Sequence, residues 1–119
     1  MEKSRYIELL YKEPKKRPRR KCMQNTLQDM QNLVKGCIEV IRYKDVLLIY
    51  NKEKQKEKRE PNVILKNNIT IYGSFFITGD DYENADFISL TEKQFKRFRN
   101  EFKVEQIKNK EMEEELECL

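Results

Sequence analysis

The sequence predicts an α+β domain, built as a small mixed or antiparallel sheet of about four to five strands with two helices on one face. Three observations predict it. Residues 69–79 (ITIYGSFFITG) are rich in β-branched and aromatic residues, as strands are. Residues 25–36 place apolar side chains three and four positions apart, and residues 95–107 repeat that spacing, which is typical of amphipathic helices.

The first elements are a strand, a basic run and a helix. Residues 5–10 favour an edge strand, and the cation-rich run 12–21 follows, held extended by its two prolines. The helix over 25–36 has clear end signals. Asn25 or Thr26 can accept the free amide hydrogens of its first turn, and Gly36 suits a left-handed residue at its end.

The second half of the predicted sheet starts with a hairpin. Residues 37–43 and 45–51 read as two strands joined by a tight turn, and the polar run 52–60 reads as a solvent-exposed loop. The short apolar piece 62–65 fits no class by its pattern. Residues 69–79 are expected to form one long strand, with Gly73 marking a bulge or a close backbone approach.

The last elements are a short strand and a second helix. Residues 87–90 can pair briefly after an acidic turn. Thr91 and Gln94 form a capping box, which predicts a helix start, and the apolar stripe then runs to about residue 110. At 119 residues the chain predicts one domain, divided as 1–23 (strand plus basic arm), 24–110 (a single α+β domain) and 111–119 (an acidic C-terminal tail).

Composition argues against catalysis. The chain has no histidine, the side chain best suited to proton transfer near neutral pH, and its three glycines are too far apart for a phosphate loop. We therefore predict that it is not an enzyme and needs no cofactor and no metal. A metal-dependent hydrolase with Asp80, Asp81 and Glu83 as ligands is the weakest alternative, because these carboxylates lack the spacing of a known calcium loop.

Binding residues are predicted mainly in the basic run. Its cations can neutralise an acidic partner or the phosphates of nucleic acid. Phe75 and Phe76 must point to opposite faces of a strand, so one ring is either covered by a second layer or exposed, where with Tyr72 or Tyr50 it would form a stacking platform for bases or a partner-binding patch. The candidate contact residues are Lys15, Lys16, Arg17, Arg19, Arg20, Lys21 and Tyr72.

Neither secretion nor membrane insertion is expected from the sequence. The chain lacks an apolar run of the roughly 20 residues that a membrane-spanning helix needs, and its N-terminus lacks the apolar core of a signal peptide. The odd cysteine count matches no disulfide or zinc pattern, so free thiols in a reducing compartment are expected. These features predict a cytoplasmic protein without membrane contacts.

Several short motifs, taken in order, resemble the family called domain of unknown function 3846. They are the helix ending at Gly36 before Ile38-Glu39-Val40, Asn62 after a proline, Gly73, Gly79-Asp80 and Ser89-Leu90-Thr91. The resemblance covers roughly residues 24–102. Members often have Gly-Gly where this chain has Lys35-Gly36, and neither the basic arm nor the acidic tail matches the family pattern.

The resemblance implies a genetic setting in phages, plasmids and other mobile elements of bacteria, and it carries no active site. The expected function is a non-enzymatic interaction protein that binds a host protein or ribonucleoprotein complex. Inhibition of a defence complex, as by an anti-CRISPR protein, is one form of that role. The alternative is a nucleic-acid-binding accessory protein that uses the basic arm. The expected location is the cytoplasm of a bacterial host cell, and the sequence sets no oligomeric state.

Overall fold

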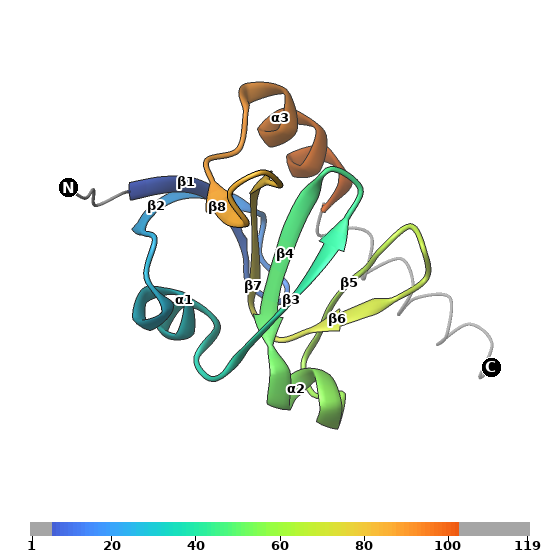
Figure 1. Ribbon diagram of the computed structural model, residues 1–119. Coiled ribbons are helices and arrows are strands. Elements are labelled where there is room, and N and C mark those ends of the chain that lie inside the picture. Colours follow the sequence, from blue (N-terminus) through green and yellow to red (C-terminus); the bar gives the residue numbers. More distant parts are fainter. Residues whose placement is uncertain (1–5, 103–119) are drawn as a thin grey trace, which may run out of the picture.

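The computed structural model describes residues 6–102 and shows an α+β protein. Its main sheet has six antiparallel strands in the order β2-β1-β7-β4-β3, with β8 paired to the end of β7. A second sheet consists of β5 and β6 (Figure 1). The elements are β1 (Tyr6–Lys12), β2 (Arg19–Gln24), α1 (Leu27–Val34), β3 (Ile38–Tyr43), β4 (Val46–Asn51), α2 (Lys52–Glu57), β5 (Pro61–Ile64), β6 (Thr70–Tyr72), β7 (Phe75–Asp81), β8 (Asp86–Ile88) and α3 (Glu92–Glu101).

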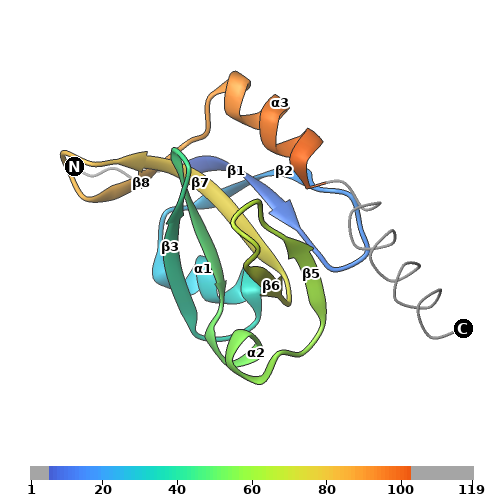
Figure 2. The ribbon, with the colours of Figure 1, turned by 90° about the vertical axis from the view of Figure 1, so that its right-hand side faces the viewer.

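Both faces of the main sheet are covered, which corrects the expectation of two helices on one face. Phe75 packs in a cluster with Phe98 and Phe102 at α3, and the small sheet contributes Ile71 to the same cluster. Phe76 packs on the opposite face with side chains of α1. Figure 2 shows α3 and α1 on either side of the sheet. Because Phe75 and Phe76 are both fully buried, neither ring is available as an exposed stacking platform.

The N-terminal segment belongs to the sheet. Strand β1 is not an edge strand, because it pairs with β2 on one side and with β7 on the other. The basic run is therefore not one extended arm between prolines. Its ends form the facing strands of a β-hairpin, the turn lies at residues 13–18, and Pro18 is buried. Strand β1 also contributes tyrosine, isoleucine and leucine side chains to both core clusters, so it is buried on both faces.

The helix α1 confirms the expected cap at its start and corrects the one at its end. The Thr26 side chain accepts a hydrogen bond from the Asp29 backbone N–H at 3.1 Å. The left-handed residue is Lys35, with a φ of 65°, and not Gly36. Gly36 is needed for a different reason, since a Cβ there would lie 2.8 Å from Nδ2 of Asn51. That amide donates to the carbonyl of Val34 at 2.9 Å.

The predicted hairpin of β3 and β4 is confirmed. The prediction that the polar run 52–60 is a loop is wrong for its first half. Residues 52–57 form α2, because Oδ1 of Asn51 accepts the Lys54 backbone N–H at 2.9 Å and so caps the helix. Lys58 ends the helix in a left-handed conformation. No residue of α2 is buried, so its sequence lacks the apolar periodicity by which helices are recognised.

The apolar run 69–79 is split between two sheets. Residues 70–72 belong to the small sheet and residues 75–81 to the main sheet. The break falls at Gly73, whose φ of +78° favours glycine. Its backbone N–H donates to the carbonyl of Glu60 at 2.7 Å. The expected close backbone approach at Gly73 is therefore present, and the unclassed piece 62–65 supplies the partner strand β5.

The end of the described chain follows expectation. Strand β8 pairs with β7, and α3 begins with the complete capping box of Thr91 and Gln94. The continuation of this helix to residue 110 and the acidic tail 111–119 lie outside the described residues. Within residues 6–102, no helix has the length and apolar character to cross a membrane.

Candidate binding surface

Three of the predicted contact cations lie on the turn of the β1–β2 hairpin. Lys15, Lys16 and Arg17 are all exposed there. Lys16 is 3.8 Å from a carboxylate oxygen of Glu13. Within the described residues, Lys15 and Arg17 have no carboxylate at ion-pair distance. The turn therefore presents positive charge on a backbone that is held at both sides by the sheet.

Arg19 and Lys21 lie on the face of β2 that adjoins α1. Arg19 is 5.4 Å from the ring centre of Tyr11, and the Lys21 ammonium is 5.8 Å from the same ring. Arg19 also lies 3.5 Å from a Glu13 oxygen. These contacts hold the cations near the sheet and leave Arg19 exposed. The two side chains extend the positive surface from the turn along the edge strand.

Arg20 points to the other face and serves mainly as a link within the fold. Its guanidinium contacts oxygens of Glu8 at 2.6 Å and Glu92 at 2.8 Å, and it lies 4.0 Å from the ring centre of Phe95. The hydrogen bonds from Arg20 hold the pKa of Glu92 below its usual range. Arg20 therefore ties the edge strand β2 to the start of α3, and its charge is already matched by carboxylates.

Helix α3 adds two cations that sequence reasoning missed. Lys96 and Arg99 follow Glu92 at spacings of four and seven, which places them on the same flank of the helix. That flank faces β2, because Arg20 of β2 bonds to Glu92. Both side chains are exposed. The basic surface, defined here as Lys15, Lys16, Arg17, Arg19, Lys21, Lys96 and Arg99, therefore lies around the edge strand β2 on both of its faces, with Arg19 and Lys21 on the α1 side and Lys96 and Arg99 on the α3 side.

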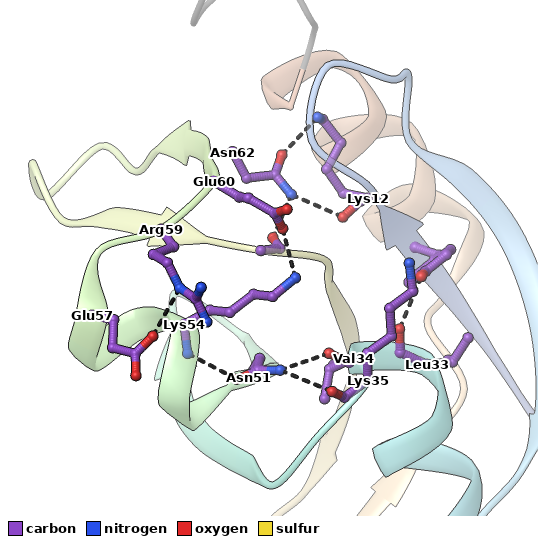
Figure 3. Close-up of polar contacts among 12 residues, drawn as sticks. Lys12, Leu33, Val34, Lys35, Asn51, Lys54, Glu57, Arg59, Glu60 and Asn62 are labelled. Carbon is purple, nitrogen blue, oxygen red and sulfur yellow. Dashed lines mark hydrogen bonds and ion pairs between the residues drawn. The ribbon is translucent and has the colours of Figure 1, made fainter.

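Lys12, a cation of the same basic run, is not on this surface. It is 1% exposed. Its ammonium donates to Oδ1 of Asn62 at 2.7 Å (Figure 3) and also to the Glu13 carbonyl at 2.8 Å. The Asn62 amide donates to the carbonyls of Lys12 and Gly73 at 3.0 and 2.7 Å. This cluster joins β1 to the small sheet and is structural.

Burial gives Lys12 a measurable pH dependence. Loss of hydration lowers its pKa to about 8, with partial opposition from the charge of Glu13. Between that value and the ordinary pKa near 10.5, the unfolded chain holds the proton more tightly than the folded protein does. The free energy of unfolding should therefore rise by about 2 kcal/mol from pH 8 to pH 10.

The measurement is urea unfolding across this pH range, with Lys12→Met as the comparison. Removing the titrating group should flatten the rise. Burial also raises the pKa of Tyr43 and Tyr50 to about 12. Their contribution to the free energy of unfolding is therefore constant below pH 10 and is lost only above it. Equal slopes for the two proteins between pH 8 and pH 10 would show that Lys12 is not the group responsible.

Tyr72, the remaining predicted contact residue, lies in the small sheet. Its register partner is Pro61 of β5, and its backbone N–H donates to Oε1 of Gln55 at 2.9 Å. The residue is half-buried. Since the main sheet is covered on both faces, Tyr72 does not belong to an exposed aromatic face of that sheet.

The acidic residues proposed for a hydrolase are bound to other side chains. Asp80 accepts a hydrogen bond from Arg42 at 2.9 Å. Asp81 accepts the Asn84 side-chain amide at 2.8 Å and so holds the turn before β8. Across residues 6–102, no three acidic or cysteine side chains are grouped so that they could hold a metal ion. The structure does not bring Asp80, Asp81 and Glu83 together as a ligand set.

The described part of the surface includes two shallow hollows. One, of about 400 Å³, lies between the start of β1 and β8. The carboxylates on its wall are already bonded, Asp81 to Asn84 and Asp86 to the Asn25 amide at 3.0 Å. The other, of about 390 Å³, lies at the end of α1 and is lined by polar residues and Cys37. The basic surface is therefore the stronger candidate for binding.

Comparison with protein families identifies the chain. The family model described as a domain of unknown function, DUF3846, matches residues 7–103. The chain belongs to this family. The match begins at Ile7 in β1, so the DUF3846 region includes the β1–β2 hairpin except Tyr6 and extends further than the resemblance over residues 24–102. Comparisons with curated proteins and with solved structures found no match.

Proposed function

We propose that this DUF3846 protein is a non-enzymatic binding protein of a phage or other mobile element. It contacts a host protein or ribonucleoprotein complex through the basic surface. Inhibition of a host defence complex, in the manner of an anti-CRISPR protein, is the form of this role that such a genetic setting favours. The setting rests on the family resemblance, and the contact surface rests on the geometry of the hairpin and α3.

The observation that carries the proposal is a fixed, exposed, positively charged turn. Lys15 and Arg17 stand on a hairpin whose Lys12 and Pro18 are both buried. Fixing the turn in the fold lowers the ordering cost that a flexible arm would meet on binding. Positive charge at such a site speeds association with a partner of opposite charge and helps to select it.

The pattern of charge favours a protein partner. Glu13 lies within 4 Å of Lys16 and Arg19, and Glu8 and Glu92 flank Arg20. Such interleaved carboxylates would repel a continuous line of phosphates, whereas a protein surface can present both signs in register. The expected partner therefore has an acidic patch beside a few basic side chains.

The test uses charge reversal at the turn. The variant Lys15→Glu/Arg17→Glu should weaken binding to the purified host partner by about tenfold or more, because it replaces attraction with repulsion at the contact. The partner is first isolated by affinity purification from host cells with the wild-type protein as bait. The dissociation constant is then measured by calorimetry.

A matched control reverses two exposed lysines on α2, in Lys52→Glu/Lys56→Glu. This variant changes the net charge by the same amount at a different place, so it should bind within about threefold of the wild type if contact is local. Equal weakening in both variants would show a general charge effect. No weakening in the turn variant would contradict the proposed surface.

Nucleic acid is the second candidate partner, favoured by Lys96 and Arg99, which add positive charge beside the hairpin. Its signature is the salt dependence of binding to a fluorescent duplex or single strand. The logarithm of the binding constant should fall with the logarithm of salt concentration, with a slope near −0.9 for each phosphate neutralised on a duplex. Turn and α3 reversals should each reduce that slope. Binding without such a slope would argue against this candidate.

A further inference from the structure

The described chain ends beside the turn of the β1–β2 hairpin. Phe102, at the end of α3, packs edge-on against Phe75 with ring centres 5.3 Å apart. Phe75 is the register partner of Lys12, the last residue of β1 before the turn. Figure 2 shows the end of α3 next to the loop that joins β1 and β2. Whatever follows residue 102 therefore starts next to the basic surface.

The sequence that follows carries the charge that this surface lacks. Residues 111–117 read EMEEELE, which has glutamate at Glu111, Glu113, Glu114, Glu115 and Glu117. Residues 103–110 separate this segment from the end of α3, and a chain of that length spans at most about 28 Å. A tether this short gives an effective concentration on the order of mM. Binding of the acidic segment to the cationic turn would therefore be intramolecular, at a high effective concentration.

We propose that the acidic segment 111–117 docks on the basic surface of the same chain and competes there with the outside partner. Its glutamates meet Lys15 and Arg17, the two turn cations that have no carboxylate at ion-pair distance within the described structure. This inference rests on the proposed function only in its second part, the competition. The docking itself stands on charge complementarity and on the place where α3 ends.

The other lysine-rich region is a poorer dock. In and after α2, Lys54 pairs with Glu60 at 2.6 Å and Arg59 with Glu57 at 2.8 Å. These two cations are already matched by local carboxylates, whereas the exposed Lys52 and Lys56 have no carboxylate at ion-pair distance among the described residues. Figure 1 also shows α2 at the opposite end of the molecule from α3. The α2 region therefore serves as the internal reference for the experiment.

The native Cys118 lies directly after the acidic segment and allows the full chain to be tested. A nitroxide is attached to it in the variant Cys22→Ser/Cys37→Ser. These substitutions remove the other two cysteines of the chain, which are both exposed and would also be labelled. Amide signals of residues 15–17 should lose more than half of their intensity at low salt, and those of residues 52–57 should keep theirs. In 1 M salt the effect should disappear, because charges are then screened beyond about 3 Å.

The decisive control is the same labelled protein with all five glutamates of the segment changed to glutamine. Signals at the turn should then recover at low salt. Equal broadening of the turn and of α2, no broadening, or broadening that persists in the glutamine variant would each overturn the docking. A second control mixes nitroxide-labelled chains with separate isotope-enriched chains that carry no nitroxide. Broadening of the same size in this mixture would also overturn the docking, because it would show that the contact forms between two copies.

The broadening experiment needs no host partner. A negative result would therefore overturn the docking of the acidic segment and leave the proposed function to be tested by its own binding experiment. If the segment docks, the glutamine variant should bind the host partner more tightly than wild type, by severalfold. Docking without that gain would overturn the competition. Loss of partner binding in the turn-reversal variant remains the separate measure of the proposed function.

Discussion

Replacing Asn62 by alanine should lower the free energy of unfolding by about 4 kcal/mol. The side chain is 2% exposed and makes three hydrogen bonds, two to backbone carbonyls and one from the Lys12 ammonium. Its removal leaves the carbonyls of Lys12 and Gly73 without that donor and Lys12 without one of its acceptors. Each buried group left unsatisfied costs about 1 to 3 kcal/mol, and more when it is charged.

Urea unfolding measures this loss, and Asn100→Ala is the matched control. Asn100 is exposed on α3, so its replacement should change stability by less than about 0.5 kcal/mol. A cycle with Lys12→Met isolates the pair, for which we expect coupling of about 1 to 3 kcal/mol. A loss below about 1 kcal/mol for Asn62→Ala would show that the small sheet is held by its apolar contacts alone.

Asn51 is the second polar link, and its replacement by alanine should cost about 3 kcal/mol. One end of its side chain caps α2 through the Lys54 N–H, and the other donates to the Val34 carbonyl at the end of α1. The residue is 3% exposed. A lost cap costs about 1 kcal/mol, and the buried carbonyl left without a donor accounts for the rest.

Asn51→Asp separates these two roles. Aspartate keeps the oxygen that caps α2 but places a carboxylate against the carbonyls of Val34 and Lys35. Repulsion should raise the pKa of this carboxyl above its unfolded value near 3.9. The free energy of unfolding of the variant should therefore be highest below that pH and should fall as the pH rises through the folded pKa. Unfolding at pH 7 and pH 4 should show a deficit that shrinks in acid. A deficit equal at both values would contradict the role of the amide donors.

Local patterns in the chain were sufficient for several elements. The spacing of Met30 and Val34 predicted α1, and the Thr91 capping box predicted the start of α3. The alternation of side chains along a strand placed Phe75 and Phe76 on opposite faces. These predictions succeed because caps, helical stripes and strand alternation depend on residues within a few positions of each other.

The same local reasoning failed where distant contacts decide. The run 52–57 has no apolar stripe, yet α2 forms because Asn51 caps it. The apolar run 69–79 looks like one strand, but a second strand at residues 61–64 draws its first part into another sheet. The prediction that both helices cover one face of the main sheet also failed. An apolar stripe shows that a helix packs against the sheet, but it does not show against which face.

By itself, the sequence determined the α+β class, the antiparallel hairpin of β3 and β4, the starts of two helices and the excess of cations near the N-terminus. Only the tertiary structure decided what each cation does. It buried Lys12, matched Arg20 with Glu92 across a separation of 72 residues, and placed Lys96 and Arg99 on the helix flank that faces the hairpin. The physical reason is that a charge takes its role from its solvent exposure and its partners, and folding brings those partners from distant parts of the chain.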